Sequence, residues 1–372
     1  MKKKNTKSSI LFISTLFLVI GCITEKNTKK SDIENLNLFG KVKTIKLINY
    51  KILENNDEEN KDENHKDYQS KTFTLYNKQG NEVEKIRYNF KGIKEEKVVK
   101  EYGSKGNEIS HLVFNSKGDV IYNSVSKFDL NSNKIEQISY DNSGEIFHKE
   151  IIKYNLKNNK IERKLFNNEG ENNYVELFKY NDLGNKIERE VYQKNSKGEL
   201  YLDMKFLFNY DENGNMVERN CYESKEGLKM KYTQRYDENG NMVESLSYNT
   251  KGKIERKVVY NFDENGNKIE RLKYNSDNVL SGKNVSKFDN KGNEIEENVY
   301  QSDGILFHNK KYKYDENDNM IEFISLTPTL NFLPTSISSW EFEYDKNKNW
   351  IKRISFRDGT FQNKVERTIE YY

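Results

Sequence analysis

The sequence of 372 residues predicts an all-β protein, a long antiparallel β-meander of about 20 strands that is twisted or coiled. Three observations support this prediction. A pattern of 26 residues recurs eleven times and occupies nearly all of the chain after its first segment. Each copy holds two tight-turn signals, and the segments between them, roughly 7 to 10 residues long, are rich in strand-forming Val, Ile, Tyr, Phe and Thr. An aromatic share of 13% argues against a disordered chain.

Each copy of the repeat is marked by an Asn. Ile or Val stands two residues after this Asn in every copy, Glu stands three residues after it in nine copies, and Tyr or Phe stands five residues before it in all eleven. The marker residues are Asn81, Asn107, Asn133, Asn159, Asn185, Asn215, Asn241, Asn267, Asn293, Asn319 and Asn349. The repeat therefore predicts eleven β-hairpins in succession.

The first turn of each repeat has the form Tyr-Asp-Glu-Asn-Gly-Asn in its fullest copies. The Asp side chain can cap its own turn, and the Gly can adopt the positive φ that such a turn requires. The turn residues of three full copies are Gly214, Asn215, Gly240, Asn241, Gly266 and Asn267. Where Gly is missing, Ser132, Asn158, Asp318 and Lys348 take its place, and we expect mild strain at the Ser and the Lys.

Tight turns at both ends of a strand require antiparallel neighbours, because a parallel connection needs a dozen or more residues. A parallel β-solenoid with coils of 26 residues remains an alternative. Ile269 and Leu272 lie in one predicted strand but on opposite faces. Both faces of the sheet are therefore partly apolar, as expected for a sheet that curls upon itself.

Residues 1–21 have the features of a secretory signal: a lysine-rich start followed by an apolar run too short to span a bilayer. The run ends in Val19-Ile20-Gly21-Cys22, which resembles the lipobox of bacterial lipoproteins and implies diacylglycerol on the Cys22 thiol. The polar residues 22–37 are expected to form a flexible tether, and residues 38–372 the repeat domain. Lipidation of Cys22 would leave Cys221 without a disulfide partner, and we expect Cys221 to pack in a strand.

Three segments interrupt the period. They are a polar run over residues 54–68, an insertion around residues 196–202, and a segment over residues 327–334 that holds both prolines. The segment over residues 327–334 differs most from the repeat, and it predicts either a ligand site or a cap on an open end of the array. The candidate residues for this binding or capping loop are Leu330, Phe332, Leu333 and Trp340.

The sequence predicts no catalytic residues, no metal, no cofactor and no nucleic-acid partner. Without the four lysines of the signal segment, 58 Lys and Arg face 59 Asp and Glu, so the mature chain is nearly neutral. The Asp and Asn of the first turn are spaced like calcium ligands, but the Gly and Glu positions of an EF-hand loop are not matched. We expect the repeated Glu to form cross-strand ion pairs with basic residues before the first-turn aromatic, such as Lys153, Lys179, Arg235 and Lys287.

The tyrosines, the turn motif and the spacing resemble the YD repeats of Rhs-type proteins, and especially bacterial repeat lipoproteins labelled Rhs-repeat or sugar-binding. This resemblance covers residues 38–372 and rests on YDENGN at 210–215 and 236–241, FDENGN at 262–267 and YDENDN at 314–319. It implies a non-enzymatic lipoprotein of the bacterial cell envelope, held by its lipid at the outer membrane or cell surface, whose repeats bind a glycan or protein ligand. A structural or assembly lipoprotein acting as a spacer or shell is the alternative.

Overall fold

The computed structural model describes residues 30–51, 68–224, 227–327 and 336–372. These residues form one short helix, α1 (Asp32–Asn35), and 24 strands. The strands are β1 (Val42–Lys51), β2 (Tyr68–Tyr76), β3 (Glu82–Asn89), β4 (Lys94–Tyr102), β5 (Glu108–Phe114), β6 (Val120–Phe128), β7 (Lys134–Tyr140), β8 (Ile146–Tyr154), β9 (Lys160–Phe166), β10 (Asn172–Tyr180), β11 (Lys186–Lys194), β12 (Leu200–Tyr210), β13 (Met216–Glu223), β14 (Gly227–Tyr236), β15 (Met242–Tyr248), β16 (Ile254–Phe262), β17 (Lys268–Tyr274), β18 (Leu280–Phe288), β19 (Glu294–Gln301), β20 (Leu306–Tyr314), β21 (Met320–Leu326), β22 (Ser336–Tyr344), β23 (Trp350–Arg357) and β24 (Thr360–Tyr371).

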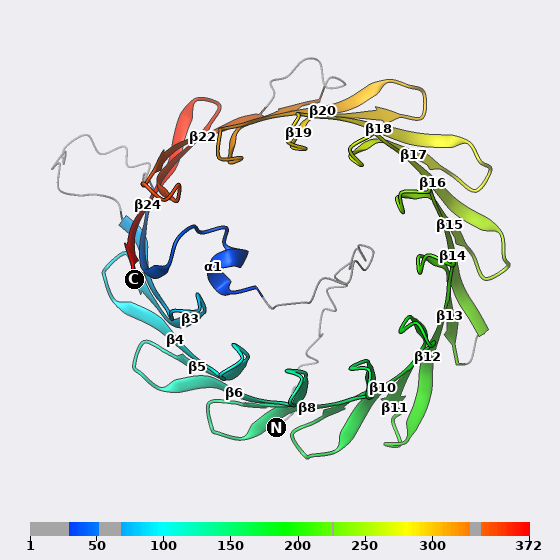
Figure 1. The fold of residues 1–372 in the computed structure, drawn as a ribbon, viewed down its shortest axis with the longest axis horizontal. Helices are drawn as coiled ribbons and strands as arrows, with labels where there is room; N and C mark the ends of the chain where they lie inside the picture. The colour runs from blue at the N-terminus through cyan, green and yellow to red at the C-terminus, as the bar shows by residue number, and fades with distance from the viewer. Residues whose placement is uncertain (1–29, 52–67, 225–226, 328–335) are drawn as a thin grey trace, which may run out of the picture.

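The strands form a single antiparallel sheet in which each strand pairs with the next one along the chain, as the two turns per repeat predict. The sheet is closed: β1 also pairs with β24, from Val42 opposite Tyr371 to Lys51 opposite Asn363. Figure 1 shows the resulting ring, with the first and last strands side by side. The prediction of an open meander was therefore wrong, and so was the solenoid alternative.

The closure of the sheet is explained by its two edges and by its twist, and neither can be read from a single repeat. An open sheet would leave two edges with unpaired N–H and C=O groups, and β1 and β24 are among its longest strands, with 10 and 12 residues. The twist between neighbouring strands bends a long meander until its two ends meet. Pairing β1 with β24 then satisfies both edges at once.

The first turns are held by the side chain that begins them. In the turn after β12, Asp211 Oδ1 accepts hydrogen bonds from the backbone N–H groups of Asn213 at 3.0 Å and Asn215 at 2.8 Å. Gly214 has a φ of +83°, and Gly240 and Gly266 have φ values of +80° and +79°. The substituted positions adopt the same conformation, with φ of +68° at Ser132, +62° at Asn158, +62° at Asp318 and +65° at Lys348.

Gly240 offers a clean test of this backbone requirement, because no other atom lies within 4 Å of where its Cβ would be. We expect Gly240→Val to lower the free energy of unfolding by at least about 1 kcal/mol through strain alone. Glu238→Ala in the same exposed turn should change it by less than about 0.5 kcal/mol. Chemical denaturation measures both, and equal effects would show that the turn geometry does not matter for stability.

Tyrosine hydroxyls join successive first turns. The first-turn Tyr of six repeats donates a hydrogen bond to the backbone carbonyl of the residue that follows the marker Asn of the preceding repeat. The pairs are Tyr102 to Glu82, Tyr154 to Lys134, Tyr180 to Lys160, Tyr210 to Lys186, Tyr236 to Met216 and Tyr314 to Glu294, at 2.8 to 3.2 Å. These tyrosines therefore stabilise the contact between neighbouring repeats.

Residues 30–41, which precede β1 and include α1, lie inside the ring (Figure 1). Helix α1 begins with a capping box, in which Ser31 and Glu34 satisfy each other's backbone N–H groups. Ile33 of this helix forms a small core with Leu38, Val42, Ile45 and Tyr76. Leu47 and Ile369 pack against the same core, so the sheet face that carries Ile45, Leu47 and Ile369 is the inner face.

Candidate binding surface inside the ring

The outer face of the sheet carries the repeated Glu in ion pairs. The four predicted pairs all form: Lys153 with Glu162 at 3.2 Å, Lys179 with Glu188 at 2.6 Å, Arg235 with Glu244 at 3.8 Å and Lys287 with Glu296 at 2.7 Å. The basic partners are all more than half exposed, so each pair contributes little to stability. The Glu column is thus a solvated structural ladder.

Positions 13 residues apart lie on adjacent strands and on the same face, because two strands and two turns take 26 residues. One such row on the inner face runs through Glu150, Arg163, Glu176 and Arg189 on β8 to β11. Arg163 contacts Glu150 at 2.6 Å and Glu176 at 3.3 Å, and Arg189 Nε contacts Glu176 at 2.8 Å. Both carboxylates are buried.

The acids of this row remain charged although they are buried. Burial raises the pKa of Glu176, but the charges and hydrogen bonds of Arg189 and Arg163 outweigh it and hold that pKa below the ordinary value. Burial likewise raises the pKa of Glu150, and hydrogen bonds from Arg163 and Lys134 outweigh it. Charge is therefore compensated on this part of the inner face.

Farther along the ring the inner face carries cations without such compensation. Arg219 on β13, Arg256 on β16 and Lys268, Arg271 and Lys273 on β17 face the lumen, as their pairing with inner-face residues shows. Among the residues that the structure describes, none of the five lies within 4.0 Å of a carboxylate oxygen. The Nε of Arg271 is buried and has no hydrogen-bond partner in the described ranges.

Two tyrosine rings lie among these cations. The guanidinium of Arg219 lies 4.6 Å from the ring centre of Tyr232, and the ammonium of Lys268 lies 4.4 Å from the ring centre of Tyr260. Between the two tyrosines, on β14 to β16, is a hollow of about 500 Å³. It is lined by Met230, Tyr232, Ser245, Ser247, Tyr248, Glu255, Arg256, Val258 and Tyr260.

The like charges affect one another. Desolvation lowers the pKa of Lys273, the positive charges of Arg271 and Arg256 lower it further, and the negative charge of Glu297 opposes this shift without cancelling it. An anion placed among these groups would relieve this repulsion and would meet two tyrosine faces and two serine hydroxyls. The five cations with Tyr232, Tyr260, Ser245 and Ser247 are here called the inner basic surface.

The structure places the sequence-predicted site residues elsewhere. Trp340 lies on β22 and faces the lumen opposite Ser355, far along the ring from the inner basic surface. Cys22, Leu330, Phe332 and Leu333 lie outside the described residues. Cys221 is a free thiol packed in β13 with 2% of its surface exposed, and burial raises its pKa. The described residues contain no cluster of three or more His, Cys, Asp or Glu that could hold a metal.

Sequence reasoning missed the inner basic surface, although a signal was present. The position four residues after the marker Asn is Arg in five repeats, at Arg163, Arg189, Arg219, Arg271 and Arg353. The residue 13 positions before each Arg lies next to it on the inner face and decides whether a carboxylate balances the Arg charge. This residue is Glu150 for Arg163 and Glu176 for Arg189, but Val258 for Arg271.

A family model described as an uncharacterised protein matches residues 278–371. No curated protein matches the sequence. Among solved structures, the chain is similar to TcdB2-TccC3, with 12% identity over 80% of this chain and 20% of that chain and a TM-score of 0.31. It is also similar to a porin-like protein from Bacteroides uniformis, with 12% identity over 60% of this chain and 95% of that chain and a TM-score of 0.27.

A third similar structure is the Photorhabdus luminescens Tc holotoxin pore, with 12% identity, 80% of this chain and 19% of that chain covered, and a TM-score of 0.30. The chain thus spans about a fifth of the length of the toxin-complex chains. At these scores the likeness is one of β-structure. The predicted resemblance to Rhs-type proteins is matched at that level alone.

Proposed function

We propose that this protein is a non-enzymatic lipoprotein of the bacterial cell envelope, anchored through Cys22, whose ring binds an anionic glycan on the inner basic surface. The observation that carries the proposal is the set of five cations, Arg219, Arg256, Lys268, Arg271 and Lys273, that face the lumen without a carboxylate partner among the described residues. The basic start, the apolar run and Val19-Ile20-Gly21-Cys22 support the anchor. No helix in the described ranges has the length and apolar character needed to span a bilayer.

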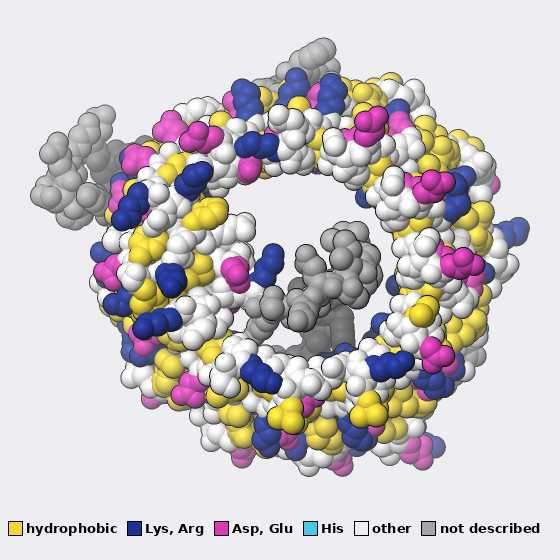
Figure 2. All heavy atoms as spheres, in the orientation of Figure 1, with side chains coloured by type: hydrophobic (Ala, Val, Ile, Leu, Met, Phe, Trp, Pro, Cys, Tyr) yellow, Lys and Arg dark blue, Asp and Glu magenta, His cyan; other side chains and the backbone are white. Residues whose placement is uncertain are grey.

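The chemistry of the surface favours a sugar chain that carries carboxylate or sulfate groups. Guanidinium groups bind such anions through paired hydrogen bonds. Tyrosine faces pack against the apolar faces of sugar rings while their hydroxyls remain solvated. Serine hydroxyls can donate to and accept from sugar hydroxyls. The described residues of the ring surround a central opening (Figure 2), and a sugar chain bound there would lie along several strands of the inner face.

The proposal is tested with polygalacturonate as the probe and neutral dextran as its control. Replacing Arg256 and Arg271 together by Gln should weaken binding of polygalacturonate by about a hundredfold, since a charged hydrogen bond contributes about 1.5–3 kcal/mol. The matched control replaces the outer-face residues Lys257 and Lys283, which pair with Glu244 and Glu270, by Gln. The control should bind like the wild type, as measured by titration calorimetry at fixed salt.

Three results would contradict the glycan proposal. The wild type and the Arg256→Gln/Arg271→Gln protein could bind polygalacturonate equally, both variants could lose affinity equally, or a single-stranded oligonucleotide of matched charge could bind as tightly as the glycan. The last result would point to unspecific attraction of polyanions.

The alternative of a structural ring without a small ligand has one observation in its favour. The tyrosine-to-carbonyl bonds tie successive first turns together at six places in the ring. A purely structural ring predicts no saturable binding of any glycan and no effect of the two arginine replacements. The same titrations therefore separate the two functions.

A further inference from the structure

We propose that the rim formed by the first turns rests on the lipid surface, with Leu130, Leu156 and Leu183 entering the headgroup region. This orientation rests on the proposed function, because it takes the lipid anchor at Cys22 as its starting point. The first turns form one rim of the ring. The second turns, such as residues 249–252 between β15 and β16, form the other rim, which flares outward in Figure 1.

The described residues nearest in sequence to Cys22 lie at the first-turn rim. The backbone N–H of Ile33 donates to the carbonyl of Gly80 at 3.0 Å, and the N–H of Glu82 donates to Asp32 at 2.7 Å. Both contacts tie α1 to the first turn after β2. Between Cys22 and Lys30 the chain spans eight steps, which reach at most about 28 Å when fully extended.

The other rim is too far for this tether. A nine-residue strand such as β2 is roughly 30 Å long. A lipid on Cys22 therefore cannot hold the second-turn rim against a membrane without stretching the tether to its limit. The exposed apolar residues of that rim, such as Phe90 and Phe307, which are 62% and 43% exposed, consequently lie away from the lipid.

The first-turn rim presents three leucines on consecutive turns. Leu130 is 90% exposed, Leu156 is fully exposed and Leu183 is 78% exposed. Neighbouring first turns are two strands apart, about 9–10 Å. Single exposed leucines are common on protein surfaces, but a row of them at the rim nearest to the anchor matches an apolar contact.

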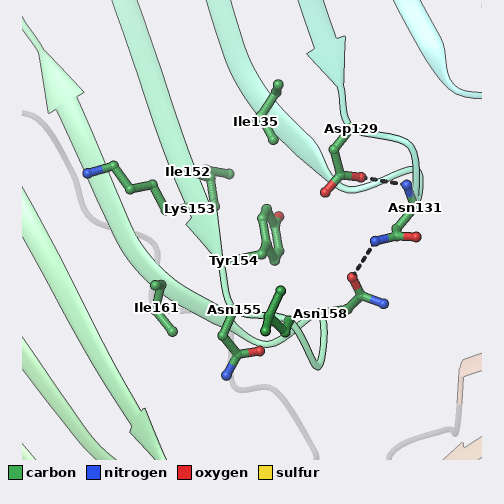
Figure 3. Close-up of a pocket in the computed structure, with 10 residues that line it drawn as sticks. Asp129, Asn131, Ile135, Ile152, Lys153, Tyr154, Asn155, Asn158 and Ile161 are labelled. Carbon is green, nitrogen blue, oxygen red and sulfur yellow. Dashed lines mark hydrogen bonds between the residues drawn. The ribbon is translucent and has the colours of Figure 1, made fainter.

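Hydrogen bonds hold these turns in a fixed array. The side chain of Asn131 donates to Asn158 at 2.8 Å, and Lys157 Nζ donates to the carbonyl of Asp182 at 3.0 Å. Figure 3 shows Asn131 reaching from its own turn to Asn158 in the next one. The leucines are therefore presented together and lose little further freedom on contact with lipid.

Charge differs around the first-turn rim, and this difference favours membrane contact at one part of the rim. The turns that hold the leucines and the first turn before them carry Lys105 and Lys157 beside Asp129 and Asp182, so this part of the rim has no net charge. Four of the first turns that follow along the rim carry, after the capping Asp, the acidic residues Glu212, Glu238, Glu264 and Glu316. An anionic lipid surface repels these acidic turns and does not repel the uncharged leucine part of the rim. The ring then tilts toward its leucines, and the mouth of the lumen at the second-turn rim faces away from the lipid.

The test uses the full chain with its lipid, in vesicles of phosphatidylethanolamine and phosphatidylglycerol. Leu156→Cys and, as the matched control on the other rim, Phe307→Cys each carry an environment-sensitive fluorophore. Cys221 stays unlabelled because it is buried. Brominated lipids should quench the label at position 156 about threefold or more over that at position 307, since quenching requires insertion near the acyl chains.

The outcomes separate this inference from the function on which it rests. Anchored protein that is quenched mainly at position 307, equally at both positions or at neither would overturn the docking and leave the anchor intact. Wild type that carries no lipid on Cys22 and stays off the vesicles would overturn the anchor and the docking together, while polygalacturonate binding would be unaffected.

Discussion

Replacing Arg163 by Ala should lower the free energy of unfolding by about 2–4 kcal/mol, because it leaves two buried carboxylates short of a partner. Glu150 and Glu176 are 6% and 4% exposed, and Arg163 contacts both. Glu150 retains Lys134 at 3.1 Å, and Glu176 retains Arg189. Because these ion pairs remain, the decrease in the free energy of unfolding is smaller than it would be for a buried carboxylate with no partner.

The adjacent residue on the outer face is the control. Lys164 contacts Glu162 at 2.8 Å, where both side chains are reached by water. Lys164→Ala should therefore change the stability by less than about 1 kcal/mol. Urea denaturation measures the free energy of unfolding of both variants. Similar decreases would show that the buried ion pairs of the inner row contribute no more to stability than an exposed pair.

The same variant should alter the acid sensitivity of the protein. The pKa values of Glu150 and Glu176 are lowered in the folded state, so their contribution is fully present above the unfolded value of about 4.3 and is lost as the pH falls through the folded values. We expect the stability difference between wild type and Arg163→Ala to be constant near pH 7 and to shrink below about pH 4. A difference that stays constant down to pH 2.5 would contradict this account.

The order of the strands follows from turn chemistry, which is local and therefore readable in the sequence. Asp211 and Gly214 specify their turn without any distant contact, and so the hairpins and their antiparallel pairing were predictable. The paired outer ladder was predictable for the same reason, since Lys153 and Glu162 flank a single turn.

The closure and the inner face could not be predicted in this way. Contact between Val42 and Tyr371 joins the two ends of the domain, and no repeat contains information about the number of strands at which the twist brings the ends together. The inner face is defined only by closure. Arg271 and Lys273 thus resemble any other strand residues until the ring turns the face that they share with Tyr260 and Arg256 toward the lumen.

Replacing Asn349 by Ala should destabilise the protein by about 2–3 kcal/mol, because this side chain joins the last repeat to the segment that precedes the first strand. Its amide accepts a hydrogen bond from the backbone N–H of Phe39 and donates one to the carbonyl of the same residue, both at 2.8 Å. It also donates to the hydroxyl of Tyr371 at 2.7 Å, and it is 2% exposed.

The marker Asn of the full repeats has a different role. Asn241 Nδ2 donates to Asp237 at 3.0 Å within its own turn. Asn349 has no following repeat of the same kind, and its side chain turns instead to Phe39. The segment before β1 therefore occupies the place of a twelfth first turn, and Asn349 holds it there.

Asn241→Ala is consequently the matched control and should cost less than about 1 kcal/mol, since it removes one local hydrogen bond and leaves no buried backbone group unpaired. Amide hydrogen exchange locates the difference. In Asn349→Ala the amides that join β1 and β24 should exchange faster than those between β14 and β15, because loss of the Phe39 contact opens the ring at its closure first. Uniformly faster exchange around the ring would mean that the seam between β1 and β24 is no weaker than any other strand pair.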